Sequence, residues 1–301
     1  MRTRFAPSPT GPLHLGHAYS AILAHDMALA AGGEFLLRIE DIDQSRARPE
    51  WEEQIYDDLA WLGLSWETAV MRQSERMEVY ARALKTLWDE HILFACTCNR
   101  RDVLEAASAP QDGPAVYGPD GIIYPGTCNT SANKTGCGDW PVPTDTALRL
   151  DMSMAAERVF HHRIARAEAG WQWLGSFTEQ GSGPKGESGL IEFTSESMQQ
   201  DIGDVVLARR DMGTSYHLSV VLDDAAQKIT DVVRGEDLFE ATKIHVVLQR
   251  LLGLASPTYH HHALIRDESG KRLAKRDDAR SIATYRDDGA SPADIRAMVG
   301  L

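Results

Sequence analysis

The chain has 301 residues, of which 43% are hydrophobic and 25% charged, a composition typical of a globular protein with one large or two modest domains. A formal net charge of −13 at pH 7 excludes non-specific nucleic-acid binding through a broadly basic surface, because such binding is mainly neutralisation of phosphates. No stretch approaches the roughly 18 consecutive apolar residues of a membrane span and no secretory signal opens the chain, so we expect a cytoplasmic protein with no membrane partner.

The first ninety residues alternate between helix and strand patterns. In chain order these are a helix over 14–31, a buried strand over 34–41 and amphipathic helices over 51–62 and 77–87. Gly32 and Gly33 follow the first helix directly and supply its stop. Strands alternating with helices predict an α/β fold with a parallel sheet.

The middle of the chain breaks this pattern. Residues 107–143 are rich in Gly, Pro, Asn, Asp and Ser and hold too few large apolar residues for a core, so we predict an insertion ordered by a metal. All four cysteines, at positions 96, 98, 128 and 137, fall within one 42-residue stretch, which in a cytoplasmic protein favours a metal over disulfides. Segment 180–189 is predicted to be a surface loop that closes the insertion.

Regular patterns return after residue 204. Three β-rich runs at 204–209, 215–224 and 228–238 are predicted to complete the sheet, and a helix is predicted over 242–252. Histidines 260–262 are predicted to face solvent at a strand end, with contact to a nucleotide as the alternative.

The start of the first predicted helix is a candidate phosphate site. Helix N-termini carry unpaired N–H groups and a partial positive charge, so they bind anions. Pro9 and Pro12 would stiffen the approach, and Gly11 would let the backbone come close. His14 and His17, three residues apart, would share a face of the first turn and could clamp a triphosphate. The alternative is a proline-stabilised turn with two incidental histidines.

A basic run lies near the other end of the chain. The sequence GKRLAKR at 270–276 places Lys271, Arg272, Lys275 and Arg276 within seven residues. A solvated face is the ordinary explanation of such a run. In a chain of net charge −13, however, four clustered cations are better explained by a polyanion, such as a departing pyrophosphate.

These two segments resemble the signatures of class I aminoacyl-tRNA synthetases, whose usual forms are HIGH and KMSKS; here they read HLGH and RLAKR. The stretches RFAPSPTGPLHLGH, LLRIEDID, VVRGEDL and HHALIRDESGKRLAKR are similar, in order and spacing, to the glutamyl and glutaminyl branch of that class. The resemblance implies a Rossmann-like, parallel-sheet nucleotide-binding domain with a zinc-containing insertion and a helical stem-contact portion. The expected division is 1–95 for the first half of the catalytic domain, 96–190 for an acceptor-type zinc insertion, 191–250 for the second half and 251–301 for the stem-contact portion.

A glutamate substrate needs a cation for its side-chain carboxylate and an anion for its ammonium group. Arg4 and Arg234 could supply the cation, each through two parallel hydrogen bonds, and Glu40 the anion. The resemblance implies an amino-acid site formed by Arg4, Ser8, Glu40, Tyr216 and Arg234. It also implies catalytic roles for His14, His17 and Lys275, and ATP binding by His14, Gly16, His17, Arg272 and Lys275. The ordinary alternatives are a solvated terminal arginine for Arg4 and a core residue in a strand for Tyr216.

Three positions depart from the family pattern. Ala274 stands where the family usually has a hydroxyl, Arg272 replaces the first lysine of the signature, and Val220 replaces a polar residue near the substrate. The first change removes one hydrogen bond but no charge. These departures put a simple transfer of glutamate affinity in doubt.

The cysteines predict tetrahedral, structural zinc held by Cys96, Cys98 and Cys128 with a fourth ligand. By chemistry Cys137 is the obvious fourth ligand. Resemblance to a Cys-x-Cys…Tyr-x-x-x-Cys knuckle favours Tyr124 instead. Free cysteines without a metal are the remaining alternative.

The chain ends about 25 residues after Arg276, so we expect no anticodon-binding domain. It therefore resembles stand-alone members of the family, which activate L-glutamate with ATP and Mg²⁺ without tRNA and then transfer it to queuosine at the wobble position of tRNA(Asp). The alternatives are a truncated enzyme that charges the terminal adenosine of tRNA, a non-catalytic RNA-binding paralogue, or a nucleotidyltransferase without an amino-acid substrate. We expect a monomer.

Overall fold

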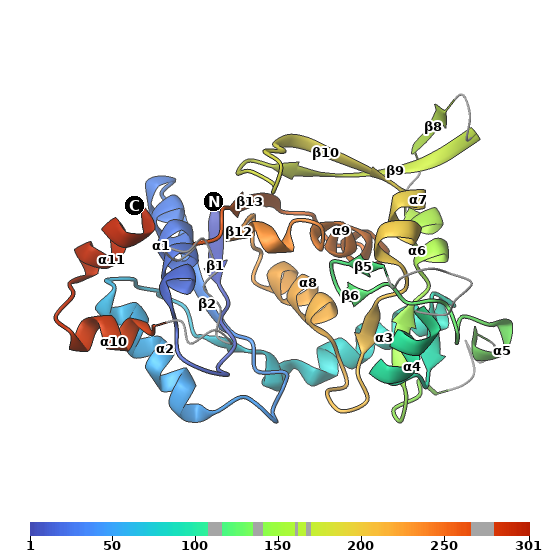
Figure 1. Ribbon diagram of the computed structural model, residues 1–301, viewed down its shortest axis with the longest axis horizontal. Helices are drawn as coiled ribbons and strands as arrows, with labels where there is room; N and C mark the ends of the chain where they lie inside the picture. Colours follow the sequence, from blue (N-terminus) through green and yellow to red (C-terminus); the bar gives the residue numbers. More distant parts are fainter. Residues whose placement is uncertain (108–115, 135–140, 160–161, 167–169, 266–279) are drawn as a thin grey trace.

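The computed structural model describes residues 1–107, 116–134, 141–159, 162–166, 170–265 and 280–301. Its amino-terminal part is a parallel sheet covered by helices (Figure 1). The strands are β1 (Arg2–Phe5), β2 (Glu34–Ile39) and β3 (Met71–Arg72), and the helices are α1 (Leu15–Ala30), α2 (Pro49–Trp61) and α3 (Met77–Asp89). The three helices and the strand predicted for the first ninety residues are confirmed, β1 and β3 were not predicted, and Gly32 follows α1 with φ of 60°.

A second sheet continues the first. Its order is β10 (Gly189–Thr194), β9 (Gly170–Glu179), β13 (Thr258–His262) and β12 (Asp231–Gly235), with β8 (His162–Arg166) paired to β9. Strand β12 runs parallel to β13 and lies beside β1, where the Thr230 N–H donates to the Arg2 carbonyl at 3.0 Å. Segments more than two hundred residues apart in the sequence thus form the centre of the molecule.

The insertion is built on antiparallel strands at the other end of the molecule (Figure 1). Strands β4 (Leu93–Cys96), β7 (Ala147–Leu150) and β11 (Val206–Ala208) form a three-stranded sheet, and β5 (Tyr117–Gly118) pairs with β6 (Gly121–Ile122). The short helices here are α4 (Arg100–Ala107), α5 (Ser131–Lys134), α6 (Met152–Val159) and α7 (Ser195–Ser197). A small separate core of Phe94, Cys96, Val103, Tyr124 and Cys128 holds this part together.

The predicted strand at 215–224 is wrong: residues Tyr216–Ala226 form helix α8. Ser215 caps it, since its hydroxyl accepts the Leu218 N–H. Buried side chains lie all around this helix, from His217 to Asp224, so its sequence lacks the one-sided apolar periodicity that distinguishes a surface helix from a buried strand.

The surface loop predicted at 180–189 is confirmed: it joins β9 to β10, most of its residues are exposed, and the Gln180 N–H donates to the Tyr259 carbonyl at 2.8 Å. Its role in closing the insertion stays a prediction.

The solvent exposure predicted for histidines 260–262 is also wrong. His260, His261 and His262 are 7%, 2% and 8% exposed, because β13 is an interior strand with partners on both edges. Each imidazole has a hydrogen-bond partner, as buried polar groups require.

The carboxyl-terminal helices are α9 (Thr242–Leu251), α10 (Ile282–Asp287) and α11 (Pro292–Val299). Helix α9 confirms the helix predicted over 242–252. Helix α11 packs against α1, where the Arg296 guanidinium contacts the Asp26 carboxylate at 2.6 Å. The two chain ends therefore lie on the same side of the molecule (Figure 1).

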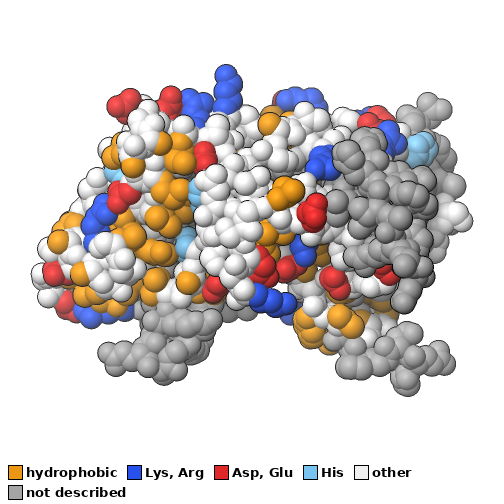
Figure 2. Space-filling view, turned by 90° about the horizontal axis from the view of Figure 1, so that it is seen from above, with side chains coloured by type: hydrophobic (Ala, Val, Ile, Leu, Met, Phe, Trp, Pro, Cys, Tyr) orange, Lys and Arg blue, Asp and Glu red, His pale blue; other side chains and the backbone are white. Residues whose placement is uncertain are grey.

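Acidic and basic side chains are interspersed over the face shown in Figure 2. That face therefore offers no broad basic surface among the described residues, and any contact with RNA there has to be local. Within the described part of the chain, no helix combines the length and apolar character that crossing a membrane requires.

Asp58 on α2 is a buried carboxylate without a hydrogen-bond partner among the described residues, and Arg286 on α10 lies 3.8 Å away. Burial raises the pKa of Asp58 from 3.8 to about 6, and Arg286 only partly offsets this. As the pH falls, the Asp58 carboxylate is therefore protonated near pH 6 in the folded protein and only near pH 4 in the unfolded chain. Its ionised form destabilises the fold above pH 6.

We expect Asp58→Asn to raise the free energy of unfolding at pH 7.5 by about 1 to 3 kcal/mol, since one pKa unit is worth about 1.4 kcal/mol. The gain should shrink as the pH falls to 4. Urea unfolding of variant and wild type at both pH values measures it, and an equal gain at both would contradict the assignment to this carboxylate.

Candidate functional site

The two histidines of HLGH bind each other at the start of α1. His14 is the N-cap: its Nδ1 accepts the Gly16 N–H at 3.1 Å, while the His14 N–H donates to His17 Nδ1 at 3.2 Å. Because both Nδ1 atoms accept, both imidazoles carry their proton on Nε2. A Cβ at Gly16 would lie 3.1 Å from His14 Cε1, so glycine fits this cap. The predicted pairing of the two histidines on the first turn is confirmed.

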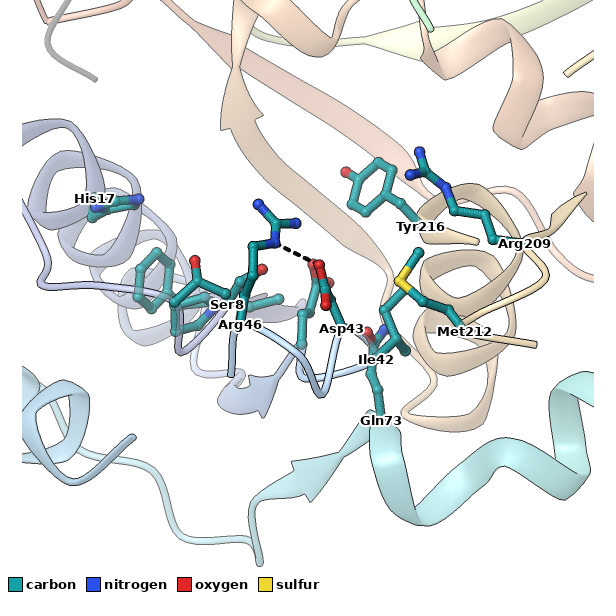
Figure 3. A pocket seen from close by; sticks show the side chains of 14 residues that line it. Ser8, His17, Ile42, Asp43, Arg46, Gln73, Arg209, Met212 and Tyr216 are labelled. Carbon is teal, nitrogen blue, oxygen red and sulfur yellow. Dashed lines mark hydrogen bonds and ion pairs between the residues drawn. The ribbon is translucent and has the colours of Figure 1, made fainter. Parts of the chain in front are cut away.

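A cavity of about 470 Å³ lies between this helix start and α8. Figure 3 shows His17 and Ser8 on one side of it and Tyr216 on the other. Glu40, which directly follows β2, also lines it. The cavity therefore sits at the carboxyl end of β2, where ligands bind in open α/β sheets.

Alternating charges form the wall behind the cavity. Arg4 Nε and Arg38 Nη1 donate to Asp224 Oδ1 at 2.9 and 2.7 Å, and Arg38 Nη2 donates to Glu40 Oε1 at 3.1 Å. Burial would raise the pKa of Asp224, but the two guanidinium groups hold it below its ordinary value. The pKa of Glu40 is raised because burial outweighs the attraction of Arg38 and Arg4. An ammonium group bound at Glu40 would stabilise its charge.

The structure brings the predicted amino-acid residues together. Ser8, Glu40 and Tyr216 line the cavity, while Arg4 and Arg234 are not among its lining residues and are 6% exposed each. Burial raises the pKa of Tyr216, Glu40 adds to that effect, and the positive charges of Arg234 and Arg4 oppose it. The charges of Glu40, Arg4 and Arg234 therefore all act on Tyr216, which lines the cavity.

The basic run falls in segment 266–279, so Lys271, Arg272, Ala274, Lys275 and Arg276 lie outside the described residues. The residues on either side of this segment contact the start of α1. Before it, His262 Nε2 lies 2.8 Å from Ser20 Oγ. After it, Ser281 forms a β-bridge with His14, and the Ile282 N–H donates to the Leu13 carbonyl at 2.9 Å.

The cysteines also come together. The sulfur atoms of Cys96, Cys98 and Cys128 lie within 4.8 Å of one another. The Tyr124 hydroxyl is 3.5 Å from the sulfur atoms of both Cys96 and Cys98. Cys137 lies outside the described residues.

Residues 1–113 and 187–301 match the family of class I tRNA synthetases (E and Q), catalytic domain. The chain belongs to this family. It is a ligase of the class I aminoacyl-tRNA synthetase family, and its α/β fold with parallel strands is the catalytic domain of that class.

Curated relatives extend the match over the whole chain. A protein named Glutamyl-Q tRNA(Asp) synthetase from Rhodobacter capsulatus is 58% identical over 301 residues, covering 100% of both chains. A protein of the same name from Deinococcus radiodurans is 35% identical, covering 98% of this chain and 86% of its own.

Solved structures agree with this assignment. A glutamate tRNA ligase from Elizabethkingia meningosepticum, in complex with its amino acid, is 26% identical with a TM-score of 0.72. The match covers 99% of this chain, which spans 60% of the length of that ligase. A methionyl-tRNA synthetase from Mycobacterium tuberculosis, 10% identical with a TM-score of 0.58, shares the fold.

Sequence reasoning for this synthetase missed two arginines that line the cavity, Arg46 and Arg209 (Figure 3). Arg46 pairs with Asp43 at 2.5 Å. Arg209 also lines a neighbouring cavity of about 770 Å³ that extends to Cys98 and includes Arg100 and Arg210. Arg209 directly follows the apolar run of β11, a signal that could have found it, whereas Arg46 lies in the loop between β2 and α2 and carries no such signal.

The cysteine cluster of this synthetase fits zinc. The Cys98 and Cys128 sulfur atoms are 3.5 Å apart, near the roughly 3.8 Å that Zn–S bonds of about 2.3 Å impose at tetrahedral angles. Arg149 stacks on the Tyr124 ring at 3.9 Å and donates to Cys96 Sγ at 3.3 Å. Three thiolates and a phenolate around Zn²⁺ carry excess negative charge, and Arg149 would offset part of it.

We expect Cys128→Ser to abolish zinc binding and to unfold the insertion, because metal binding in such knuckles supplies folding free energy. Tyr124→Phe should weaken zinc affinity at least about tenfold, and Cys137→Ser should leave it unchanged. Zinc content after dialysis against a graded chelator measures all three. Loss of zinc in Cys137→Ser with retention in Tyr124→Phe would identify Cys137 as the fourth ligand instead.

Proposed function

We propose that this chain activates L-glutamate with ATP, without tRNA, and transfers the glutamate to queuosine at the wobble position of tRNA(Asp). The observation that carries the proposal is the cavity between α1 and α8, where an anion-binding helix start meets buried arginines and Glu40. The names of the full-length relatives support the same acceptor.

In the activation step the α-carboxylate of glutamate attacks the α-phosphorus of ATP. A carboxylate–phosphorus bond forms, the bond to the β-phosphate oxygen breaks, and pyrophosphate leaves with the negative charge. The Nε2–H groups of His14 and His17 and the positive end of α1 stabilise that charge. Lys275 and Arg272 add cations from a segment whose two ends lie beside α1, and Gly16 permits the cap that orients His14. Mg²⁺ bound with ATP supplies further charge neutralisation.

Recognition of glutamate uses the opposite side of the cavity. Glu40 accepts the α-ammonium group, and Ser8 and Tyr216 line the space between. Arg234, with Arg4 behind it, provides positive charge for the side-chain carboxylate. Glutamine lacks that charge, so the arginines select glutamate.

In the transfer step a hydroxyl of the acceptor attacks the carbonyl carbon of glutamyl-adenylate. An ester bond forms, the mixed-anhydride bond to phosphate breaks, AMP leaves and the hydroxyl proton passes to solvent. We assign the acceptor's approach to the neighbouring cavity, because Arg209 lines both cavities. In this scheme residues 96–190, with structural zinc on Cys96, Cys98, Tyr124 and Cys128, form the acceptor-side insertion.

Two measurements test the proposal. Glutamate-dependent exchange of labelled pyrophosphate into ATP should proceed without RNA; absence of exchange would reject the activation step. Labelled glutamate should then pass to tRNA(Asp) that contains queuosine and not to tRNA(Asp) that lacks it. Charging of tRNA(Glu) at its terminal adenosine instead would make the chain a tRNA-charging enzyme.

A further inference from the structure

The guanidinium of Arg234 is almost fully committed to contacts inside the protein. Nε donates to His261 Nε2 at 3.1 Å and Nη1 to His245 Nδ1 at 3.2 Å. Nη2 donates to Thr242 Oγ1 at 2.6 Å and to the Leu238 carbonyl at 3.3 Å. Four of its five N–H groups are thus used among the described residues, and one on Nη1 is left for a ligand.

Since an arginine only donates, its partners must accept, and this fixes the proton of each imidazole. His245 keeps its proton on Nε2 and donates it to His217 Nδ1 at 3.1 Å. His217 in turn keeps its proton on Nε2, which lies 3.3 Å from Asp120 Oδ1. A chain of hydrogen bonds with one direction therefore runs from Arg234 through His245 and His217 to Asp120.

His261 is fixed in the same way on the other side. Its Nδ1–H points to Glu179 Oε2 at 2.5 Å, and both side chains are fully buried. His245 has no carboxylate in contact among the described residues. Burial and the positive charge of Arg234 hold the pKa of His245 well below its ordinary value, so it stays neutral and keeps accepting.

The four residues linked by these hydrogen bonds come from four separate parts of the fold. Arg234 is on β12, His245 on α9, His217 on the first turn of α8, and Asp120 in the turn between β5 and β6 of the insertion. His217 directly follows Tyr216, which lines the cavity. The hydrogen bond from Nη1 also fixes the direction of the remaining N–H on that nitrogen.

We propose that His245, oriented by His217, is a positioning residue that aims the last N–H of Arg234 at the side-chain carboxylate of the amino-acid substrate. The inference rests on the proposed function, because that function supplies the carboxylate. It adds that affinity for glutamate depends on the tautomer of a buried histidine that does not touch the substrate.

The test is glutamate-dependent pyrophosphate exchange with His245→Leu, His245→Asn and Val246→Ala. His245→Leu should raise KM for glutamate about tenfold, the loss expected for one hydrogen bond to a charged group, with kcat and KM for ATP unchanged. His245→Asn should recover most of this loss, because its amide oxygen can accept from Nη1. Val246→Ala removes buried volume from the same helix without touching Arg234 and should leave KM for glutamate unchanged. His217→Leu should raise KM less than His245→Leu, since it only frees the His245 tautomer.

Equal KM values for wild type and His245→Leu would overturn the inference, as would a parallel change in Val246→Ala. If the wild type shows no glutamate-dependent exchange, the proposed function fails, and calorimetric titration with L-glutamate decides the inference separately. Glutamate bound by the wild type and more weakly by His245→Leu would uphold the positioning role; equal or absent binding would refute it.

Discussion

Replacement of Arg234 by Gln is expected to lower kcat/KM for glutamate in pyrophosphate exchange by about 10² to 10³. The substitution removes the buried positive charge proposed to pair with the side-chain carboxylate of glutamate. Truncating one member of a buried charge pair costs about 2 to 5 kcal/mol. Most of the loss should be in KM for glutamate, because Arg234 contacts neither His14, Gly16 nor His17, the described residues proposed to bind ATP. Measured KM for ATP should change less than about twofold, the scatter expected of unrelated substitutions.

Two further variants separate charge from geometry. Arg234→Lys keeps the charge but cannot contact His261, His245 and Thr242 at once, so it should lose nearly as much as Arg234→Gln. Arg82→Gln removes one positive charge from a side chain that is 71% exposed on α3 and should have no effect. Full activity of Arg234→Gln would show that the carboxylate of glutamate is bound elsewhere.

Replacement of His14 by Asn is expected to lower kcat about 100-fold, the loss that follows removal of one donor from a developing negative charge. Asn is a good N-cap, so it can still accept the Gly16 N–H while it lacks the imidazole Nε2–H. The variant should therefore unfold at the same temperature as the wild type. KM for glutamate should stay constant, because His14 is proposed to act on the departing pyrophosphate.

His14→Ala provides the comparison. It loses the donor and also the cap, so kcat should fall as in His14→Asn and the free energy of unfolding should fall by about 1 kcal/mol. Pyrophosphate exchange and thermal unfolding of both variants measure these effects. Wild-type kcat in His14→Asn would assign the histidine to helix capping alone.

Local signals in the sequence predicted the elements that depend on local physics. The helix start at His14, the stop after Ala31 and the strand before Glu40 are each encoded within a few residues by caps, glycine and an apolar run. The site at the start of α1 could be predicted for the same reason, since helix geometry alone places His14 beside His17.

The errors concern burial set by distant partners. Helix α8 is surrounded on all sides, so no polar face marks its period, and an apolar run of that length fits a strand equally well. His261 is buried because β13 lies between β12 and β9. The order of strands in a sheet cannot be predicted from the sequence of one strand alone.

The surroundings of Arg234 show the same limit for the site. Its own position could be predicted from VVRGEDL, but its partners come from positions 238, 242, 245 and 261, all outside its own strand. Four of its N–H groups are used by the protein, so one is left for a ligand. An arginine and a carboxylate in isolation would instead form two parallel hydrogen bonds. Only the assembled packing decides how much of a side chain is left for a ligand.

The position of β1 has a consequence for synthesis of the chain on the ribosome. β1 can pair with β2 once the first forty residues have been synthesised. Its other edge is covered only after the segment around Thr230 has been synthesised. Until then a strand that is buried in the finished fold has one open edge, the kind of surface on which nascent chains associate. We expect folding to be slow and cooperative across the two halves, and chaperone binding to be concentrated in the period before β12 emerges.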